Sequence, residues 1–234
     1  GLFKSILPLI VSVIFFVLVA IQPDLGTAVI ILALGLVVIF YAGIKLIYPL
    51  ISIGIILSIS PILWTFLKPY QQNRIQIFLN PDLDPLGRGY HIIQSKIAIG
   101  SGGLKGNGFL EGSQSSLDFL PEKETDFVFA IFSEQFGFTG SILLISLFFI
   151  MFLIPVLKTF KLTQAFNKII LFVLSFKIFF EFLINISMTI GILPVVGVAL
   201  PFMSYGGSSL LSNLIICALL LNFMSINEKK RMFS

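Results

Sequence analysis

Six apolar runs, each close to the length that crosses a lipid bilayer, divide this chain. They cover residues 6–21, 26–44, 46–67, 127–157, 169–192 and 204–226. A transmembrane helix needs roughly 20 apolar residues, and in lipid its backbone polar groups must be hydrogen-bonded internally. A hydrophobic content of 57% and a mean hydropathy of +1.05 exclude an ordinary soluble domain. The sequence predicts an all-α polytopic membrane protein, with about six transmembrane helices in one domain, residues 1–234.

Most basic residues outside the central part of the chain lie in a few short connections. They are Lys4, Lys45, Lys158, Lys161, Lys168, Lys229, Lys230 and Arg231. With six crossings these connections share one side of the membrane, which the positive-inside rule makes cytoplasmic. Both ends of the chain are therefore expected in the cytoplasm, with the polar insert at residues 68–125 outside. The net charge of +4 arises largely from these connections and does not indicate binding to nucleic acid.

The insert contains a stretch that is typical of a helix lying along a membrane surface. Between residues 90 and 100, isoleucines are interspersed with polar side chains: Ile92, Ile93, Ile97 and Ile99 with Gln94, Ser95 and Lys96. This mixture predicts a short amphipathic helix. The insert has too many apolar residues for a freely solvated loop. We expect it to pack back over the transmembrane helices as a lid or a cavity wall.

The chain offers few ligands for a metal or a redox group. Cys217 is the only cysteine and His91 the only histidine, so neither a disulfide within the chain nor a His/Cys-built metal centre is expected. No cofactor is predicted, and the sequence leaves dependence on a divalent cation open.

An acidic cluster lies where the insert meets the fourth apolar run: Glu122, Glu124 and Asp126 lead directly into apolar sequence. On one interpretation Thr125 caps the helix, and Asp126 in its first turn only complements the helix dipole. On the other, crowded carboxylates beside a low-dielectric region raise the pKa of one of them, as a general base requires. A carboxylate at the mouth of a membrane helix is costly, which makes Asp126 the leading catalytic candidate.

The glycine-rich segment at residues 100–108 includes Ser101 and Lys105. Its backbone amides and the Lys105 ammonium can receive an anion in the manner of a nest, although most such runs are flexible turns. It matches neither a P-loop nor a dinucleotide fingerprint. Beside a membrane, the anion to expect is a lipid-linked phosphate or pyrophosphate.

Other polar groups have simpler interpretations. Lys177 and Glu181, four residues apart in the fifth run, are expected to form an ion pair that faces other helices, in preference to an ion pathway. Asp24 is expected to cap the helix that begins near Gly26. The SYGGSS sequence at residues 204–209 lets helices approach closely or lines a cavity with hydroxyls.

Three separated motifs resemble one known family. The first is GRGYHIIQSKIAIGSGGLKGNGFLEGSQSSLDFLPEKETDFVFAIFSEQFGFTG at residues 87–140; the others are QPDLGTA at 22–28 and GILPVVGVALPFMSYGGSS at 191–209. In order and spacing they resemble the shape, elongation, division and sporulation (SEDS) family, over nearly the whole chain. The variant GSQSSLDFLPE is similar to elongation members rather than to division members.

The resemblance implies a peptidoglycan glycosyltransferase of the bacterial inner membrane, acting in cell elongation and rod-shape maintenance. Such enzymes polymerise lipid II, an undecaprenyl-pyrophosphate-linked disaccharide, and work with a class B penicillin-binding protein. The family's catalytic aspartate falls on Asp126, which would accept the proton of the acceptor 4-hydroxyl. Further residues of the motifs are expected to bind substrate: Glu122, Lys105, Ser101, Gln94, Ser204 and Tyr205.

Two departures from the family pattern stand out. The family fold has about ten transmembrane helices, and this chain is similar to the last six, so it is expected to be the C-terminal part of that fold. Lys123 and Glu124 precede Thr125 where relatives usually carry a basic residue and a histidine, which adds negative charge beside Asp126. Two alternatives remain open: a lipid II flippase, or a non-catalytic scaffold for the penicillin-binding protein.

Overall fold

In the computed structural model of the chain, the described residues are 2–22, 24–41, 54, 58, 64–65, 68–85, 87–109, 111–112 and 124–232. These residues contain helices, turns and loops and no β-strand, in agreement with the predicted all-α class. The chain divides into two compact units. The first comprises Gly1–Gly89 and Pro194–Val196, and the second comprises Tyr90–Leu193 and Gly197–Ser234.

The first unit is built on a helical hairpin of α1 (Leu2–Ile21) and α2 (Leu25–Tyr41). The helices pack closely at Gly35, where a side chain would overlap that of Ser12. Asp24 caps α2 as predicted, because its Oδ1 accepts a hydrogen bond from the Thr27 amide at 3.0 Å. Both helices match predicted apolar runs. In each, the apolar stretch within the described residues is shorter than 18 residues.

The insert begins in this unit with α4 (Pro69–Leu79) and the 3₁₀ helix η1 (Pro81–Leu83). The two are joined by a turn in which the Asn80 side chain accepts from the Asp82 amide. The predicted span at residues 46–67 lies almost wholly outside the described residues.

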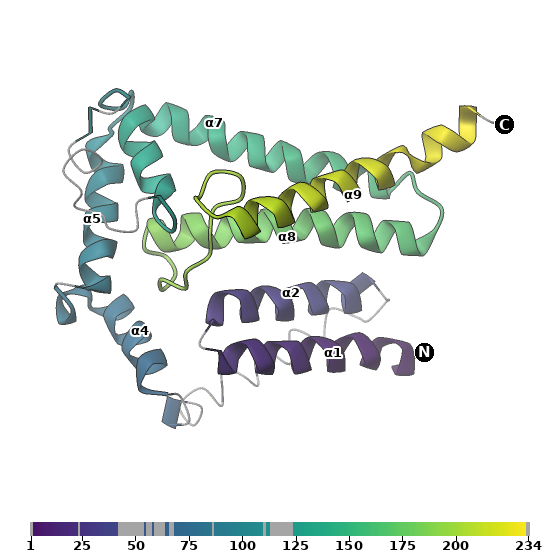
Figure 1. The fold of residues 1–234 in the computed structure, drawn as a ribbon, viewed down its shortest axis with the longest axis horizontal. Coiled ribbons are helices and arrows are strands. Elements are labelled where there is room, and N and C mark those ends of the chain that lie inside the picture. Colours follow the sequence, from purple (N-terminus) through teal and green to yellow (C-terminus); the bar gives the residue numbers. More distant parts are fainter. Residues whose placement is uncertain are drawn as a thin grey trace. The chain divides into compact units, whose positions relative to one another are not determined.

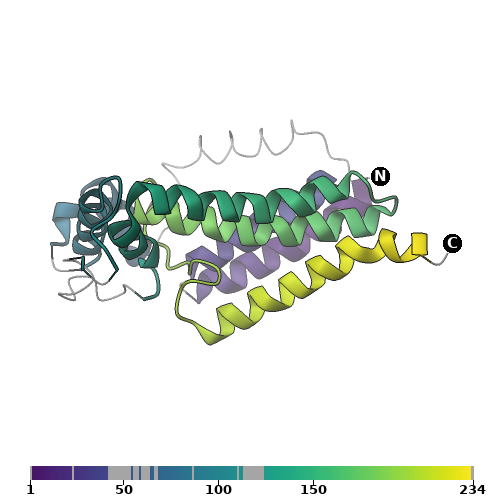
Figure 2. The ribbon, with the colours of Figure 1, turned by 90° about the horizontal axis from the view of Figure 1, so that it is seen from above.

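The second unit is a bundle of α7 (Val128–Thr159), α8 (Ala165–Thr189) and α9 (Gly207–Met232). Figures 1 and 2 both show α7 and α8 side by side. Stacked phenylalanines join these two helices: Phe148 on Phe182, with centroids 4.3 Å apart, and Phe152 on Phe179 at 4.4 Å. All three helices are long and apolar enough to cross a membrane. Their starts agree with those of the predicted runs within four residues.

The predicted run at residues 127–157 is not one continuous helix. Gly137, with φ of +66° and ψ of −165°, breaks α7 into a short first part and a longer second part, and Figure 1 shows the first part turning away. The backbone groups freed by the break pair with the glycine-rich segment. The Phe138 amide donates to the Gly103 carbonyl at 2.9 Å, and the Asn107 amide to the Glu134 carbonyl at 3.0 Å. This pairing supplies the bonds that the broken helix lacks.

The predicted amphipathic helix is α5 (Arg88–Ser101). Ile92, Ser95 and Ala98, three residues apart, form its buried face. The Ser95 hydroxyl donates to the Thr189 carbonyl at 2.7 Å, which fixes α5 against the last turn of α8. The expectation that this part of the insert packs back over the helices is confirmed.

Candidate active site

Asp126 lies in a turn at residues 124–127, just before α7 begins at Val128. The N-cap position is Phe127, no side chain caps the helix, and its first turn holds no acid. The interpretation of Thr125 as a cap with Asp126 in the first turn is therefore wrong. The helix begins later than the sequence suggests because the turn is held by other segments. Asp126 is half-buried.

The loop that leads into α9 holds this turn through its backbone. The Ser204 hydroxyl donates to the Thr125 carbonyl at 2.5 Å and accepts from the Leu200 amide at 2.7 Å. The Tyr205 amide donates to the Glu124 carbonyl at 2.7 Å. Two of the predicted substrate-binding residues, Ser204 and Tyr205, thus lie directly beside the catalytic candidate.

A side chain from α8 holds the same turn from another direction. Asn185 is fully buried, and its amide nitrogen donates to the Asp126 carbonyl at 2.9 Å and to the Val198 carbonyl at 2.8 Å. The carboxylate of Asp126 lies near Gly197, where an added Cβ would stand 3.7 Å from Oδ2. Gly197 has φ of +77°, a left-handed conformation that favours glycine.

Helix α5 covers the residue that follows Asp126. The His91 ring lies 6.1 Å from the Phe127 ring, centroid to centroid, at a tilt of 40°. Phe127 is almost fully buried. Among the described residues, Nδ1 of His91 is buried without a hydrogen-bond partner. The sole histidine is therefore part of the site's wall, although sequence interpretation gave it no role there.

The glycine-rich segment does not present its amides as the predicted nest requires. The amides of Gly102, Gly103, Gly106, Asn107 and Gly108 all donate to backbone carbonyls, two of them at the break in α7. The anion-nest interpretation of these five amides is wrong, because three of them donate to carbonyls of α5 or of the segment itself and two donate to carbonyls of α7. The Lys105 side chain remains exposed on this segment.

Two further predicted substrate-binding residues, Ser101 and Gln94, belong to α5. Ser101 is exposed, and its hydroxyl donates to the Ala98 carbonyl of its own helix. Gln94 is half-buried on α5, and Glu122 lies outside the described residues. A role in substrate binding stays a prediction for all six residues.

Two buried polar residues were missed by the sequence analysis. Asn185 gave no signal, since a lone asparagine in an apolar run is ordinary. Glu134 did give one: it is a carboxylate within an apolar run. It is fully buried on α7, and a Cβ added to Gly112 would overlap its carboxylate. The described residues contain no group of three or more His, Cys, Asp or Glu side chains that could hold a metal ion.

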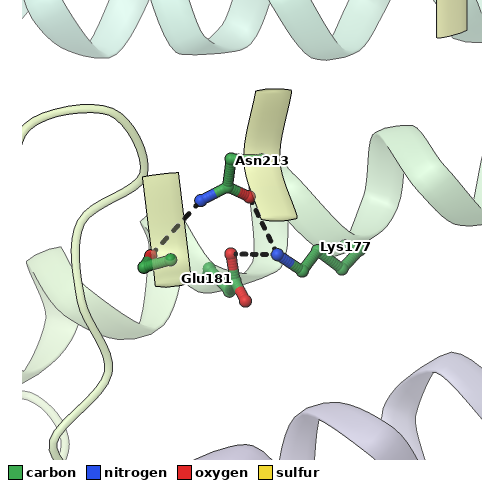
Figure 3. Close-up of polar contacts among 4 residues, drawn as sticks. Lys177, Glu181 and Asn213 are labelled. Atoms are coloured by element: carbon green, nitrogen blue, oxygen red, sulfur yellow. Dashed lines mark hydrogen bonds and ion pairs between the residues drawn. The ribbon is translucent and has the colours of Figure 1, made fainter. Parts of the chain in front are cut away.

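The predicted ion pair between Lys177 and Glu181 is confirmed, with Nζ and Oε2 2.8 Å apart. Figure 3 shows that it extends to α9. The Lys177 ammonium also donates to Oδ1 of the fully buried Asn213 at 2.8 Å, and Asn213 donates to the Ser209 hydroxyl over a long 3.5 Å. We call these four side chains the α8–α9 network.

An apolar groove of about 550 Å³ lies along α7 and α8. Its wall is mainly Ile, Leu, Phe and Gly side chains, and its two serines, Ser133 and Ser141, are hydrogen-bonded to each other at 2.9 Å. Asp126 is not part of its lining. The groove is therefore a feature separate from the candidate active site.

The chain matches the family model of a cell cycle protein family that includes FtsW, RodA and SpoVE, over residues 2–229. It is 44% identical over 220 residues to the peptidoglycan glycosyltransferase MrdB of Escherichia coli K12, covering 93% of this chain and 58% of that protein. It is 46% identical over 164 residues to the peptidoglycan glycosyltransferase RodA of Treponema pallidum, covering 70% of this chain and 37% of that protein.

Solved structures show the same fold. A chain of a peptidoglycan synthase complex that coordinates polymerization and crosslinking superposes with a TM-score of 0.75 at 31% identity, covering 94% of this chain and 60% of that one. The rod shape determining protein RodA of Thermus thermophilus superposes with a TM-score of 0.60 at 22% identity, covering 94% and 55%. The present sequence thus spans about three-fifths or less of these relatives. Because the family match runs through nearly all of it, the chain belongs to the FtsW, RodA and SpoVE family of cell cycle proteins, the SEDS family.

Proposed function

We propose that this chain is the part of a peptidoglycan glycosyltransferase that polymerises lipid II during cell elongation, with Asp126 as its catalytic base. One observation carries the proposal: a half-buried carboxylate stands outside its helix on a turn held by α8 and by the loop before α9. A base must keep a fixed position while a proton leaves the acceptor. A turn secured at consecutive carbonyls provides that position.

The reaction requires little else of the protein's own chemistry. Asp126 accepts the proton of the acceptor sugar's 4-hydroxyl as that oxygen attacks the anomeric carbon of the donor. The new carbon–oxygen bond forms as the bond to the pyrophosphate breaks, and the lipid pyrophosphate leaves with its electron pair. Attack from the face opposite the leaving group inverts the anomeric centre. Proton transfer of this kind typically contributes about 10²–10⁴ in rate.

Among the residues predicted to bind substrate, Tyr205 and Lys105 have exposed side chains, which makes them the leading candidates for contact with lipid II. Tyr205 uses its backbone amide to hold Glu124 while its side chain is 79% exposed, so the ring is available to a sugar face. The exposed Lys105 ammonium is available to the pyrophosphate as a mobile point charge. We further propose contacts to lipid II from Glu122, Ser101, Gln94 and Ser204.

The proposed setting follows from the family and the charge pattern. The chain is a membrane protein, with three candidate spans among its described residues. We propose that it lies in the bacterial inner membrane, with the ends of the chain on the cytoplasmic side and residues 68–125 outside. We propose a class B penicillin-binding protein as its partner, which would crosslink the strands that this chain polymerises.

The structure favours surface chemistry over the flippase alternative. A flippase needs charged groups that can exchange partners along a path through the membrane. In the described spans, the Lys177–Glu181 pair is closed on itself and on Asn213. A non-catalytic scaffold would explain the spans. It gives no reason for a carboxylate on a turn whose three consecutive backbone carbonyls are all held by hydrogen bonds.

Lipid II polymerisation by the purified chain in lipid nanodiscs tests the proposal, with Asp126→Asn as the key variant. We expect glycan strands from the unmodified chain and a loss of at least about 10²-fold in the variant, the lower limit for removal of a general base. Asp24→Asn is the matched control, because asparagine caps a helix as well as aspartate does.

The outcomes separate the three functions. Full activity of Asp126→Asn would disprove the base, and equal loss in Asp24→Asn would show that any lost aspartate destabilises the chain. An unmodified chain that moves lipid II across vesicles without making glycan would favour the flippase. An unmodified chain that does neither would favour the scaffold.

A further inference from the structure

Asn185 occupies an unusual position among the buried polar residues of the second unit. It lies on α8, one turn before the helix ends at Thr189, and it is fully buried. Its two hydrogen bonds reach out of its own helix, to carbonyls 59 positions before it and 13 positions after it. The first belongs to Asp126 and the second to Val198. One amide group therefore ties together two segments that are remote in the sequence.

The orientation of the amide is fixed by its neighbours. Both contacting atoms are carbonyl oxygens, which only accept, so the nitrogen and not the oxygen must face them. The oxygen, Oδ1, is buried and has no hydrogen-bond partner among the described residues. A buried amide oxygen without a partner destabilises a fold. Stability alone therefore does not explain an asparagine in an apolar helix, and its two donated bonds must be the reason.

The two bonds act on the two sides of the catalytic candidate. One holds the carbonyl of Asp126 itself. The other holds Val198, the residue after Gly197, whose Cα position faces Oδ2 of the same aspartate. Asn185 thus joins the backbone of Asp126 itself to the loop that faces its carboxylate, while Ser204 joins the preceding Thr125 carbonyl to Leu200 of the same loop.

We propose that Asn185 is a positioning residue that fixes the Asp126 carboxylate for proton abstraction by joining its carbonyl to the loop of residues 197–200. The proposal rests on the function proposed above. Without the two donors, Asp126 loses its own link to the loop, although Ser204 still holds Thr125, and the carboxylate moves relative to the acceptor hydroxyl. Displacement by about 1 Å at a reacting centre can lower the rate about 10²-fold. Substrate affinity changes little, because Asn185 is buried and is not itself available to the substrate.

Asn185→Leu removes both donors while keeping the number and branching of the side-chain heavy atoms. Asn185→Asp keeps the shape but, protonated in its buried position, can donate only one hydrogen bond. Asn213→Leu is the matched control: it is an equally buried membrane asparagine, but its bonds join α8 to α9 and do not reach Asp126. Gel filtration and helical circular dichroism show which variants fold. Hydrogen exchange by mass spectrometry follows residues 124–130 and 197–204, and lipid II polymerisation gives kcat and KM.

We expect both segments to exchange faster in Asn185→Leu and at least one of them in Asn185→Asp. In Asn185→Leu, kcat should fall about 10²-fold with KM within about threefold. Asn213→Leu should leave both segments and kcat near the unmodified values. Unchanged exchange in either segment, an unchanged kcat, or an equal kcat loss in Asn213→Leu would overturn the proposal. If the unmodified chain makes no glycan, the proposed function fails, while the exchange data still decide whether Asn185 joins the two segments.

Discussion

Helix α8 carries two polar clusters that use their hydrogen bonds in different ways. In the α8–α9 network, Lys177, Glu181 and Asn213 bond side chain to side chain. One turn beyond Glu181, Asn185 bonds only to backbone carbonyls of segments outside the helix. The first cluster neutralises its own charge and joins two helices. The second holds the turn that bears Asp126, the proposed base, and on this proposal the difference separates a structural role from a positioning role.

The two clusters should respond differently when one hydrogen-bond partner is removed. Removing one member of a closed ion pair leaves a charge stranded in a poorly solvated region, which is costly to stability. Removing a group that holds a segment costs less stability and more activity, since the rest of the fold remains satisfied.

The largest effect on stability is expected for Lys177→Met, which strands Glu181 and breaks the bond to Asn213. The free energy of unfolding should fall by about 3 kcal/mol, the lower end for a broken buried pair, because the stranded Glu181 side chain is 16% exposed. Denaturant titration in micelles measures this loss. The kcat per folded molecule should stay unchanged, since the network does not touch the turn at Asp126.

The double variant Lys177→Met/Glu181→Met is the control for that prediction. Replacing both charges with apolar side chains of similar length should restore most of the lost stability, because apolar replacement of a buried pair is often neutral. If the double variant is as unstable as the single one, the pair has a role beyond neutralising itself. Loss of kcat in the double variant would contradict the division between the two clusters.

Gly137→Ala should have the next largest effect. The residue adopts φ of +66°, and a Cβ there would overlap the backbone at Gly106. Strain of this kind costs about 1–3 kcal/mol, and the lost pairing with residues 103–108 should loosen the insert. Thermal unfolding measures the loss. Gly100→Ala is the control, because an added Cβ there meets nothing within 4 Å; equal destabilisation by both would contradict the prediction.

Local patterns predicted much of the fold, because they depend on residues close in sequence. Apolar runs located α7, α8 and α9, the mixture of residues in the insert located α5, and a spacing of four identified the Lys177–Glu181 pair. The break at Gly137 was missed, because the hydrogen bonds that stabilise it are made with backbone groups some 30 residues earlier in the chain. A glycine within an apolar run does not by itself indicate a break.

The site was predicted in part for the same reason. Asp126 was selected as a candidate because a carboxylate beside apolar sequence is costly wherever its partners lie, and its catalytic role stays a prediction. Asn185 was missed because its importance depends on a carbonyl 59 residues away. The anion-nest interpretation failed because the amides were assumed to be available, whereas five of them donate to backbone carbonyls of α5, of the segment itself and of α7. Long-range hydrogen bonds, and not composition, decide these cases.

Ser204→Ala should have a smaller effect on stability than Gly137→Ala. It removes the donor to the Thr125 carbonyl and the acceptor for the Leu200 amide, at a cost of about 1–2 kcal/mol. Because the turn remains held by Asn185, kcat should fall about tenfold, less than in Asn185→Leu. Polymerisation kinetics measure this. Ser225→Ala is the control, since its hydroxyl bonds only to the Asn222 carbonyl of its own helix; a kcat loss there as well would contradict the assignment.

The smallest effect is expected at Tyr205, whose backbone and side chain have separate roles. Tyr205→Ala keeps the amide that holds the Glu124 carbonyl, so the turn and kcat should be preserved. The exposed ring is lost, and if it stacks on a sugar, KM for lipid II should rise about five- to tenfold, the equivalent of about 1 kcal/mol. Tyr205→Phe keeps the ring and should leave KM within about twofold. A fall in kcat with unchanged KM in Tyr205→Ala would instead place the ring among the groups that position Asp126. The positioning residues of the loop would then include Tyr205 as well as Ser204.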